Sequence, residues 1–345
     1  MLILLTQRRC YKLLVSQADV FLQYLNLLGS MRKALLKRLS STIKNTCVLL
    51  LWMLVSFLKA GCQDLEPRAY LRLPVNANVI LPGFNHSHGE VLTDPSVPLK
   101  DFKANVEMVT VGYAHTFSLF GLTAQAFGVL PICYARASAL VFGQSQAVER
   151  KGTADMRFRL SVLLVGGKAL TLSEFSKRKI GTILGTSLTI QPPTGQYFSD
   201  KLVNLGTGRW AFKPEIALSQ PISKRWLLDV YTAVWLFTDN NSYFTGHALR
   251  SQNAIGAVQS HLSYNISPFA WAAIDATYYV GGNSTVDGVA NDDQVSNIRW
   301  GTTLVLPTGK RSGLKIAFSK GAVVVRGSNF TTVSLGWSYS WIGKK

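Results

Sequence analysis

Apolar and polar residues alternate one by one along most of the chain beyond residue 63. The clearest example is residues 329–341, where every second residue from Val333 onward is apolar and the residues between are small or polar. The same period of two recurs in residues 154–165, 226–238 and 295–306. Since successive side chains of a β-strand point to opposite faces, this pattern predicts strands with one apolar and one polar face.

Twelve segments carry this pattern, and most of them are 11–15 residues long. Strands of soluble sheets usually have about 5–6 residues, whereas a tilted strand needs about 9–11 residues to cross the apolar part of a membrane. The lengths therefore predict an all-β fold, a single antiparallel transmembrane β-barrel of about 12 strands. The expected strands are residues 70–84, 104–118, 122–134, 154–165, 181–192, 209–220, 226–238, 252–266, 270–281, 295–306, 312–325 and 329–341.

The connections between these segments alternate in length, as in outer-membrane barrels with long extracellular loops and short periplasmic turns. Residues 85–103, 135–153 and 193–208 are long connections, which we expect to be extracellular loops. Residues 166–180 are long where a short turn is expected, and residues 172–179 within them are predicted to form a helical turn at the periplasmic rim. A soluble β-sandwich or propeller is the competing interpretation, because one polar face per strand is normal there too.

Aromatic residues and prolines refine this prediction. Tryptophan and tyrosine residues lie near the ends of the expected strands, as in the aromatic girdles of membrane barrels. Proline has no backbone N–H to donate to a strand ladder. Pro74 and Pro82 in the first strand, and Pro131 in the third, therefore predict that these strands are broken or are edge-like or rim segments.

The first 62 residues have a different character. Basic residues that follow Met31 precede an apolar run at residues 48–58, and small residues come next. This run is too short for a spanning helix, which needs about 20 residues, and it matches a secretory signal peptide. We expect residues 1–62 to be an N-terminal extension and signal peptide cleaved after Cys62, and residues 63–345 to be an exported barrel in a Gram-negative cell outer membrane. Lipidation of Cys62 is the alternative.

The chain has 36 basic and 18 acidic residues, a formal net charge of +18. Residues 1–62 hold nine of those basic residues and one of the acidic ones, so much of the excess lies in the segment expected to be removed. The basic charge is thus weak evidence for nucleic-acid binding, and we expect no nucleic-acid partner. Only Cys133 remains beyond Cys62, which excludes an internal disulfide in the barrel.

If the apolar face of each strand contacts lipid, the opposite face lines a polar lumen. An Arg or Lys at mid-bilayer on the lipid face would cost about 2–4 kcal/mol. The residues expected to line the lumen are Glu107, Asp155, Arg157, Arg159, Arg209, Lys213, Glu215, Asp229, His261, Asp275, Arg299 and Lys315. Six of them are Arg or Lys and five are acidic, which favours a neutralised conduit over a filter for one sign of charge.

These residues predict a channel for passive passage of small molecules. Aromatic residues on the lumenal face would suit a partly aromatic or hydrophobic permeant, although they would equally suit a filled interior: Tyr231, Trp235, Phe237, Trp271 and Tyr279. The alternative is a structural barrel, or one whose loops bind partners, with its lumen closed by the charge network. The expected partners are outer-membrane lipid, the barrel-assembly machinery and a small-molecule permeant.

Candidate catalytic and metal-binding residues are sparse. No GxSxG motif, phosphate-binding loop or GxGxxG motif occurs, and none of the five histidines has a spacing typical of a Ser–His pair. His86 and His88 could bind a metal ion, and so could the acidic loop residues Asp287, Asp292 and Asp293. Neither set has the spacing of a known metal site. We therefore expect no enzyme activity, no cofactor and no metal.

Several short segments together resemble the meta-pathway-of-phenol-degradation (MetA-pathway) family of outer-membrane proteins. The resemblance covers essentially all of residues 63–345, and it implies an outer-membrane barrel that transports aromatic or hydrophobic compounds. The family supplies no catalytic residues. The segments are QDLEPRAY at 63–70, DPSVPL at 94–99, PTGQY at 193–197, KLVNLG at 201–206, RWAFKPE at 209–215, WLFTDN at 235–240, ATYY at 276–279, TVDGVA at 285–290 and NIR at 297–299.

Overall fold

The described part of the chain forms a closed antiparallel β-barrel. The computed structural model describes residues 65–92, 99–141, 143–244 and 247–343, so the expected signal peptide and cleavage site lie outside the described residues. The wall strands are β1 (Ala77–Leu92), β2 (Leu99–Leu119), β3 (Leu122–Val141), β5 (Arg157–Val165), β6 (Ile183–Gln191), β7 (Ala211–Pro221), β8 (Trp226–Phe237), β11 (Ile255–Asn265), β12 (Trp271–Gly281), β15 (Val295–Pro307), β16 (Ser312–Val323) and β17 (Gly327–Ile342).

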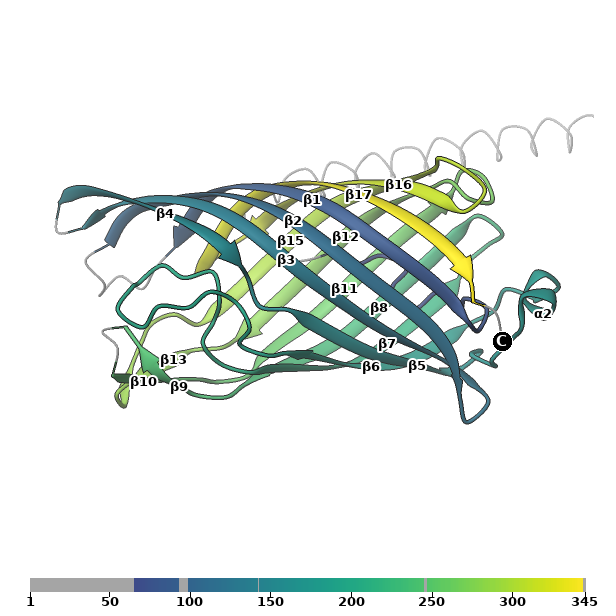
Figure 1. Ribbon diagram of the computed structural model, residues 1–345, viewed down its shortest axis with the longest axis horizontal. Helices are drawn as coiled ribbons and strands as arrows, with labels where there is room; N and C mark the ends of the chain where they lie inside the picture. Colours follow the sequence, from purple (N-terminus) through teal and green to yellow (C-terminus); the bar gives the residue numbers. More distant parts are fainter. Residues whose placement is uncertain (1–64, 93–98, 142, 245–246, 344–345) are drawn as a thin grey trace, which may run out of the picture. The chain divides into compact units, whose positions relative to one another are not determined.

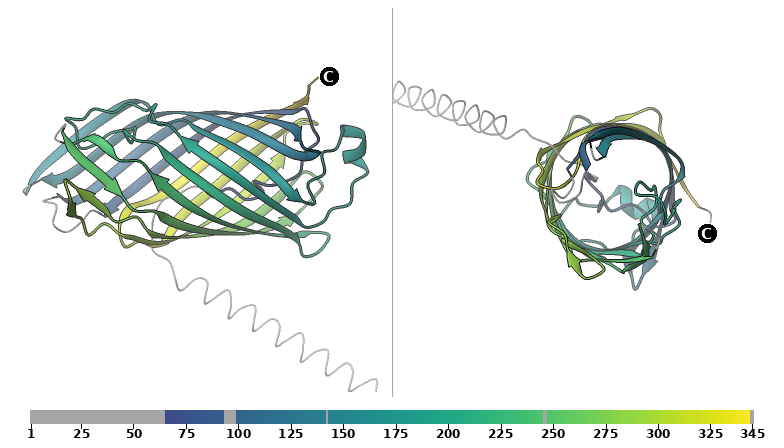
Figure 2. Two further views of the ribbon diagram at one scale, coloured as in Figure 1. Left: turned by 90° about the horizontal axis from the view of Figure 1, so that it is seen from below. Right: turned by 90° about the vertical axis from the view of Figure 1, so that its left-hand side faces the viewer.

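Pairing between strands distant in the sequence closes this wall. Each wall strand pairs with its neighbours in sequence, and β1 also pairs with β17, so that Ala77 lies opposite Ile342 (Figure 1). Viewed end-on, the barrel is a ring (Figure 2). The predicted twelve-stranded antiparallel barrel is therefore confirmed.

The two ends of the barrel are built differently. One end, here called the short-turn end, has tight turns such as residues 120–121 and 222–225. The other, here called the long-hairpin end, carries strand β4 (Gln144–Thr153), which pairs with the projecting half of β3. It also carries a small separate sheet of β9 (Asn240–Tyr243), β10 (Ala248–Gln252), β13 (Ser284–Val286) and β14 (Val289–Ala290) (Figure 1). In outer-membrane barrels the short turns are periplasmic and the long connections extracellular.

The one long connection at the short-turn end contains the helix α2 (Leu172–Ser176), within the predicted range of 172–179. Thr171 caps it: its hydroxyl accepts from the Glu174 N–H, and the Glu174 carboxylate accepts from the Thr171 N–H at 2.8 Å. This reciprocal pair satisfies two backbone donors at the helix start. Among the described residues, no helix is long and apolar enough to cross a membrane.

Three strand boundaries differ from the prediction. The expected first strand at 70–84 is instead β1 at Ala77–Leu92, and the expected loops 85–103 and 135–153 are largely extensions of paired strands. The third strand runs through Pro131 without interruption. The Pro131 carbonyl accepts from Ala154 N, in the break between β4 and β5, so the missing N–H of Pro131 faces that break and disrupts no ladder.

The outer face is apolar, as the alternation predicts. On β2 the side chains of Val109, Val111 and Tyr113 are exposed, and on β17 those of Val333, Leu335, Trp337 and Tyr339 are exposed. Near the short-turn end, the rings of Trp337, Tyr339 and Trp341 stack in sequence with centroids 6.0 Å apart. Exposed apolar side chains on this scale need a lipid surround, and the aromatic rows suit its interface with water.

Residues 65–76, here called the lumen segment, lie inside the barrel instead of forming the start of β1. Backbone bonds fix its later part at the short-turn end, where Val75 N donates to Leu170 O and Asn76 N donates to Thr116 O. Its earlier part contacts side chains of β5–β8, β11 and β12. The prediction that residues 70–76 belong to the first strand is therefore wrong.

Candidate functional site

The strand period of two brings polar side chains from many strands into one interior. On β5 the inward residues include Arg157 and Arg159, whereas Phe158 and Leu160 are exposed on the outside. The same parity on β7 and β15 turns Lys213 and Arg299 inward. Distant parts of the sequence therefore contribute to one lumen.

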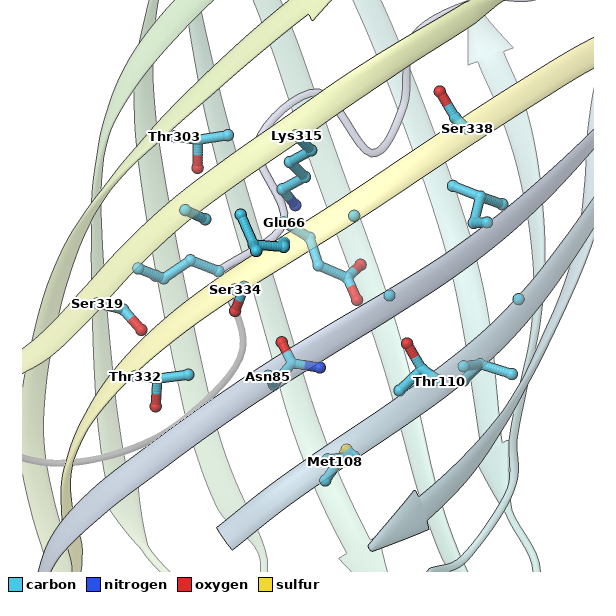
Figure 3. A pocket seen from close by; sticks show the side chains of 18 of the residues that line it. Glu66, Asn85, Met108, Thr110, Thr303, Lys315, Ser319, Thr332, Ser334 and Ser338 are labelled. Carbon is cyan, nitrogen blue, oxygen red and sulfur yellow. The ribbon is translucent and has the colours of Figure 1, made fainter. Parts of the chain in front are cut away.

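A cavity of about 560 Å³ occupies the lumen beside the lumen segment. One side of its wall comes from β1, β2, β16 and β17, whose inward residues other than Lys315 are mostly small or uncharged: Asn85, Thr110, Ser319, Thr332, Ser334 and Ser338 (Figure 3). Five basic residues line the cavity: Arg157 and Arg159 of β5, Lys213 of β7, Arg299 of β15 and Lys315 of β16. Glu66 is the one carboxylate among the residues that line the cavity.

The lumen segment is anchored on β6 and β7 through Tyr70. This tyrosine is only 2% exposed, and its hydroxyl donates to the Glu215 carboxylate at 2.8 Å and lies 2.7 Å from the Ser187 hydroxyl. The Lys213 ammonium lies 3.1 Å from the other oxygen of Glu215. Burial raises the pKa of Tyr70 far above its ordinary value, which keeps the hydroxyl a hydrogen-bond donor.

A wall glycine makes room for this anchor. A Cβ atom on Gly185 of β6 would lie 2.6 Å from the Tyr70 ring, closer than van der Waals contact allows. A Cβ on Gly301 of β15 would similarly lie 2.3 Å from the Leu65 side chain. Glycine weakens the interior of a strand, and it is typical of places where another segment approaches closely. Both glycines are therefore explained by the close approach of the lumen segment.

A second anchor lies on β8, β11 and β12. The backbone N–H of Arg68 donates to the Asp229 carboxylate at 3.3 Å, and its guanidinium donates to Asn265 Oδ1 at 2.8 Å. The same guanidinium lies 4.4 Å from the centroid of the Trp271 ring, in cation–π range. Burial lowers the pKa of Arg68 to about 10, so the side chain stays cationic at neutral pH.

A group of buried, hydrogen-bonded side chains lies next to this second anchor. His261 Nδ1 lies 2.7 Å from the Asp275 carboxylate, which also accepts from the Thr303 hydroxyl at 2.9 Å. The side chains of His261 and Asp275 are both 0% exposed. The Ser219 hydroxyl donates to Asp229 beside them. These groups hold one another in place, and of them only Thr303 lines the cavity.

Glu66 differs from the buried carboxylates Glu215, Asp229 and Asp275, because it borders the cavity. Its carboxylate accepts from Arg159 Nη1 at 2.5 Å, and its side chain is still 39% exposed. The guanidinium of Arg159 lowers the pKa of Glu66 well below its usual range, against the opposing effect of burial, and Lys213, Arg157 and Lys315 add to the lowering. Figure 3 shows Glu66 and Lys315 extending into the same space.

The structure separates the candidate lumen residues other than Glu107 into three groups. Five of the six Arg and Lys residues border the cavity, whereas Glu215, Asp229, His261 and Asp275 are buried in the bonds described above. Asp155 and Arg209 lie in connections towards the long-hairpin end. Asp155 is buried and accepts from Gly195 N and Thr207 N at 2.8 and 2.9 Å, and Arg209 donates to Gln252.

Glu107 was expected to face the lumen, but it lies on the outward face of β2. It has the same strand parity as exposed Val109 and Val111, whereas Met108 and Thr110 border the cavity. The Glu107 carboxylate lies 3.8 Å from the Arg136 guanidinium, and both side chains are largely exposed, at 41% and 53%. Arg136 lies in the part of β3 that pairs with β4, towards the long-hairpin end.

Glu66, Arg68 and Tyr70 are site residues that the sequence analysis missed. Their segment alternates like a strand, with Leu71, Leu73 and Val75 at every second position, and this pattern gave no sign of an interior position. The usable signal was the pair of prolines, Pro67 and Pro74, which flank this short run and interrupt a strand ladder.

Comparisons with known proteins agree with this architecture. A family model for the MetA-pathway of phenol degradation matches residues 82–324. An outer membrane channel from Pseudomonas putida F1 superposes with a TM-score of 0.69 at 21% identity, over 81% of this chain and 100% of that one. The beta domain of a Bordetella autotransporter gives a TM-score of 0.48 at 13% identity, over 77% of this chain and 100% of that one. No curated protein sequence matches the chain.

Proposed function

The chain belongs to the MetA-pathway of phenol degradation family, and from that premise we propose that its barrel is an outer-membrane channel for passive passage of small aromatic or hydrophobic molecules. The observation that carries the proposal is the cavity of about 560 Å³ inside a barrel whose outer face is apolar. A cavity of this volume is in the range of small-molecule sites, and the family's association with phenol degradation supports an aromatic cargo.

The aromatic residues at the cavity support the same cargo. Trp235 and Trp271 line it from β8 and β12, and Phe127 lines it from β3. Their rings face basic groups as well as open space: the Arg159 guanidinium lies 5.6 Å from the Phe127 centroid, and the Lys213 ammonium lies 5.6 Å from the Trp235 centroid. Such a surface accepts a ring and a polar substituent together.

We further propose that the barrel is not an enzyme. His261 is the histidine with a carboxylate partner, but its Nε2 makes no hydrogen bond within the described residues, and it is fully buried. A histidine that activates a nucleophile must bond that nucleophile where substrate can reach it.

The competing proposal is a barrel closed to permeants, whose projecting hairpins bind partners. It is favoured by the lumen segment, which fills part of the interior. Planar-bilayer recording of the purified protein separates the two. Discrete conductance steps that change when Arg157 and Arg159 are both replaced by Ser would support the channel. No current at any voltage, together with no uptake of aromatic compounds by liposomes, would refute it.

A further inference from the structure

The acidic and basic groups of the lumen are not distributed alike. Three wall acids near the lumen segment are already bonded to other protein groups. Glu215 bonds Tyr70 and Lys213. Asp229 accepts from Ser219 and the Arg68 N–H, and Asp275 bonds His261 and Thr303. None of the three acids borders the cavity. The near balance of charges along the sequence therefore does not hold for the space that a small molecule can occupy.

Around the cavity itself, positive charge dominates. Among the described residues, its lining contains five basic side chains and the single carboxylate of Glu66, and one of the five, Lys213, is paired with a buried wall acid, Glu215. In a space enclosed by protein, such charges are weakly screened and act more strongly than they would in bulk water. A cavity with this lining attracts anions.

The position of Glu66 shows which anion fits. Its carboxylate contacts Arg159 at 2.5 Å and extends from the lumen segment, not from the wall. Arginine binds carboxylates through charge-assisted hydrogen bonds, and rings of Phe127 and Trp235 lie beside the basic groups. The wall thus offers a carboxylate pocket next to an aromatic surface, and the chain's own glutamate occupies the pocket.

We propose that this cavity binds the carboxylate of a small amphipathic anion, such as an aromatic acid, and that Glu66 is an internal competitor for the same basic residues. The inference rests on the channel function proposed above and specifies the class of permeant. A permeant carboxylate takes the place of Glu66 on Arg159, with Lys315 close by, while its ring packs on the aromatic side of the cavity. Displacement of Glu66 removes one anchor of the lumen segment, so binding and loosening of that segment are coupled.

The test uses the full chain in planar bilayers and three probes: benzoate, which has a ring and a charge; benzyl alcohol, which has the ring without the charge; and acetate, which has the charge without the ring. We expect benzoate to interrupt the ionic current at the lowest concentration. Glu66→Gln should lower the benzoate concentration for half-block by about tenfold, and Lys315→Gln should raise it by about tenfold, a size that corresponds to loss of one charged contact.

Lys320→Gln is the matched control. Lys320 lies on the same strand as Lys315, is exposed, and does not border the cavity, so its replacement should leave the benzoate response unchanged. Equal block by benzoate and benzyl alcohol, equal block by benzoate and acetate, or a Glu66→Gln variant that responds to benzoate no more readily than the unmodified chain would each overturn the inference while leaving the channel in place. A protein that neither conducts nor passes any probe would overturn the inference and the channel function together.

Discussion

The two sides of the lumen differ in how their polar groups are used. On β7, β8, β11 and β12 the inward carboxylates and their partners are buried and bonded to one another or to the lumen segment. On β1, β2, β16 and β17 the inward residues are mostly small and uncharged, and they border open space. The first side holds the chain inside the barrel, and the second leaves a volume for something else.

This contrast separates two roles that look identical in sequence. Asp275 and Lys315 are both charged residues at inward positions of β-strands. Asp275 is fully buried and bonds two wall residues, so its loss would leave desolvated groups without partners. Lys315 borders the cavity, where water or a bound molecule can replace any partner it loses. Stability should depend on the first residue and selectivity on the second.

The largest effect is expected for Asp275→Ala on the packed side. It leaves His261 and the Thr303 hydroxyl buried without their acceptor, a change that typically costs about 3–5 kcal/mol. Equilibrium unfolding in urea from lipid vesicles would measure the loss. Asp292→Ala is the control, because its ion pair with Arg326 lies at the surface, where the Asp292 side chain is 74% exposed; a surface pair contributes about 1 kcal/mol or less. Equal losses in the two variants would contradict the contrast.

A smaller loss of about 1–3 kcal/mol is expected for Gly185→Ala, which places a methyl group 2.6 Å from the Tyr70 ring. The ring must move, and the bond from Tyr70 to Glu215 should lengthen or break. Limited trypsin digestion in proteoliposomes would detect the loosened lumen segment by faster cleavage after Arg68 and Arg72. In the control Gly256→Ala, the new methyl group lies 3.5 Å from Val280, an ordinary contact, so the cleavage rate should stay the same.

A pH dependence should distinguish an ionised Glu66 held by Arg159 from a buried carboxyl whose pKa is raised. Arg159 lowers the pKa of Glu66 well below its ordinary value, so the anchor is fully present above that ordinary value and is lost only as the pH falls through the lowered pKa. Trypsin sensitivity of the lumen segment should therefore stay constant from pH 7 to about pH 5, where trypsin still cuts. Loosening that begins at pH 6 would show that Glu66 is not held by Arg159. Glu66→Gln should be sensitive across the whole range.

The smallest effect is expected for Glu107→Gln. The carboxylate lies 3.8 Å from Arg136 on the outward face, and exposed pairs of this kind contribute about 1 kcal/mol or less. Conductance and ion selectivity should match those of the unmodified protein. A change in ion selectivity as large as that of Lys315→Gln would show that Glu107 faces the lumen, as the sequence analysis predicted.

The wall of the barrel was predictable because its signal is local. Alternation along residues 329–341 states which face of β17 is apolar, and no other part of the molecule is needed to interpret it. Alternation along β5 and β15 also puts Arg157 and Arg299 on the side of the strand that borders the cavity. It misplaced Glu107, whose parity matches exposed Val109 on the same strand. The carboxylate there lies 3.8 Å from the guanidinium of Arg136 on the neighbouring strand.

The interior arrangement was not predictable, because it depends on partners far apart in sequence. Tyr70 and Glu215 meet only because β7 and the lumen segment face each other across a closed ring. A period of two in residues 71–75 is compatible with a strand and with an extended interior segment alike. The same long-range pairing removes the wall acids from the cavity, so a count of charges along the strands could not give the sign of the cavity's charge.

The pairing of β1 with β17 has a consequence for how the molecule is made. Strands that are neighbours in sequence can pair as soon as both are made. β1 can pair with β17 only after the C-terminal part of the chain, which contains Ile342, has been made. Until then both outer strands present unpaired backbone groups, and closing so long a loop carries a large entropic cost. The lumen segment directly precedes β1, so its last residue, Asn76, lies beside this pair of strands and accepts from Gly343 N at 2.8 Å. We therefore expect pairing of β1 with β17 to be the slow step of folding, and the lumen segment to be enclosed when that pairing forms.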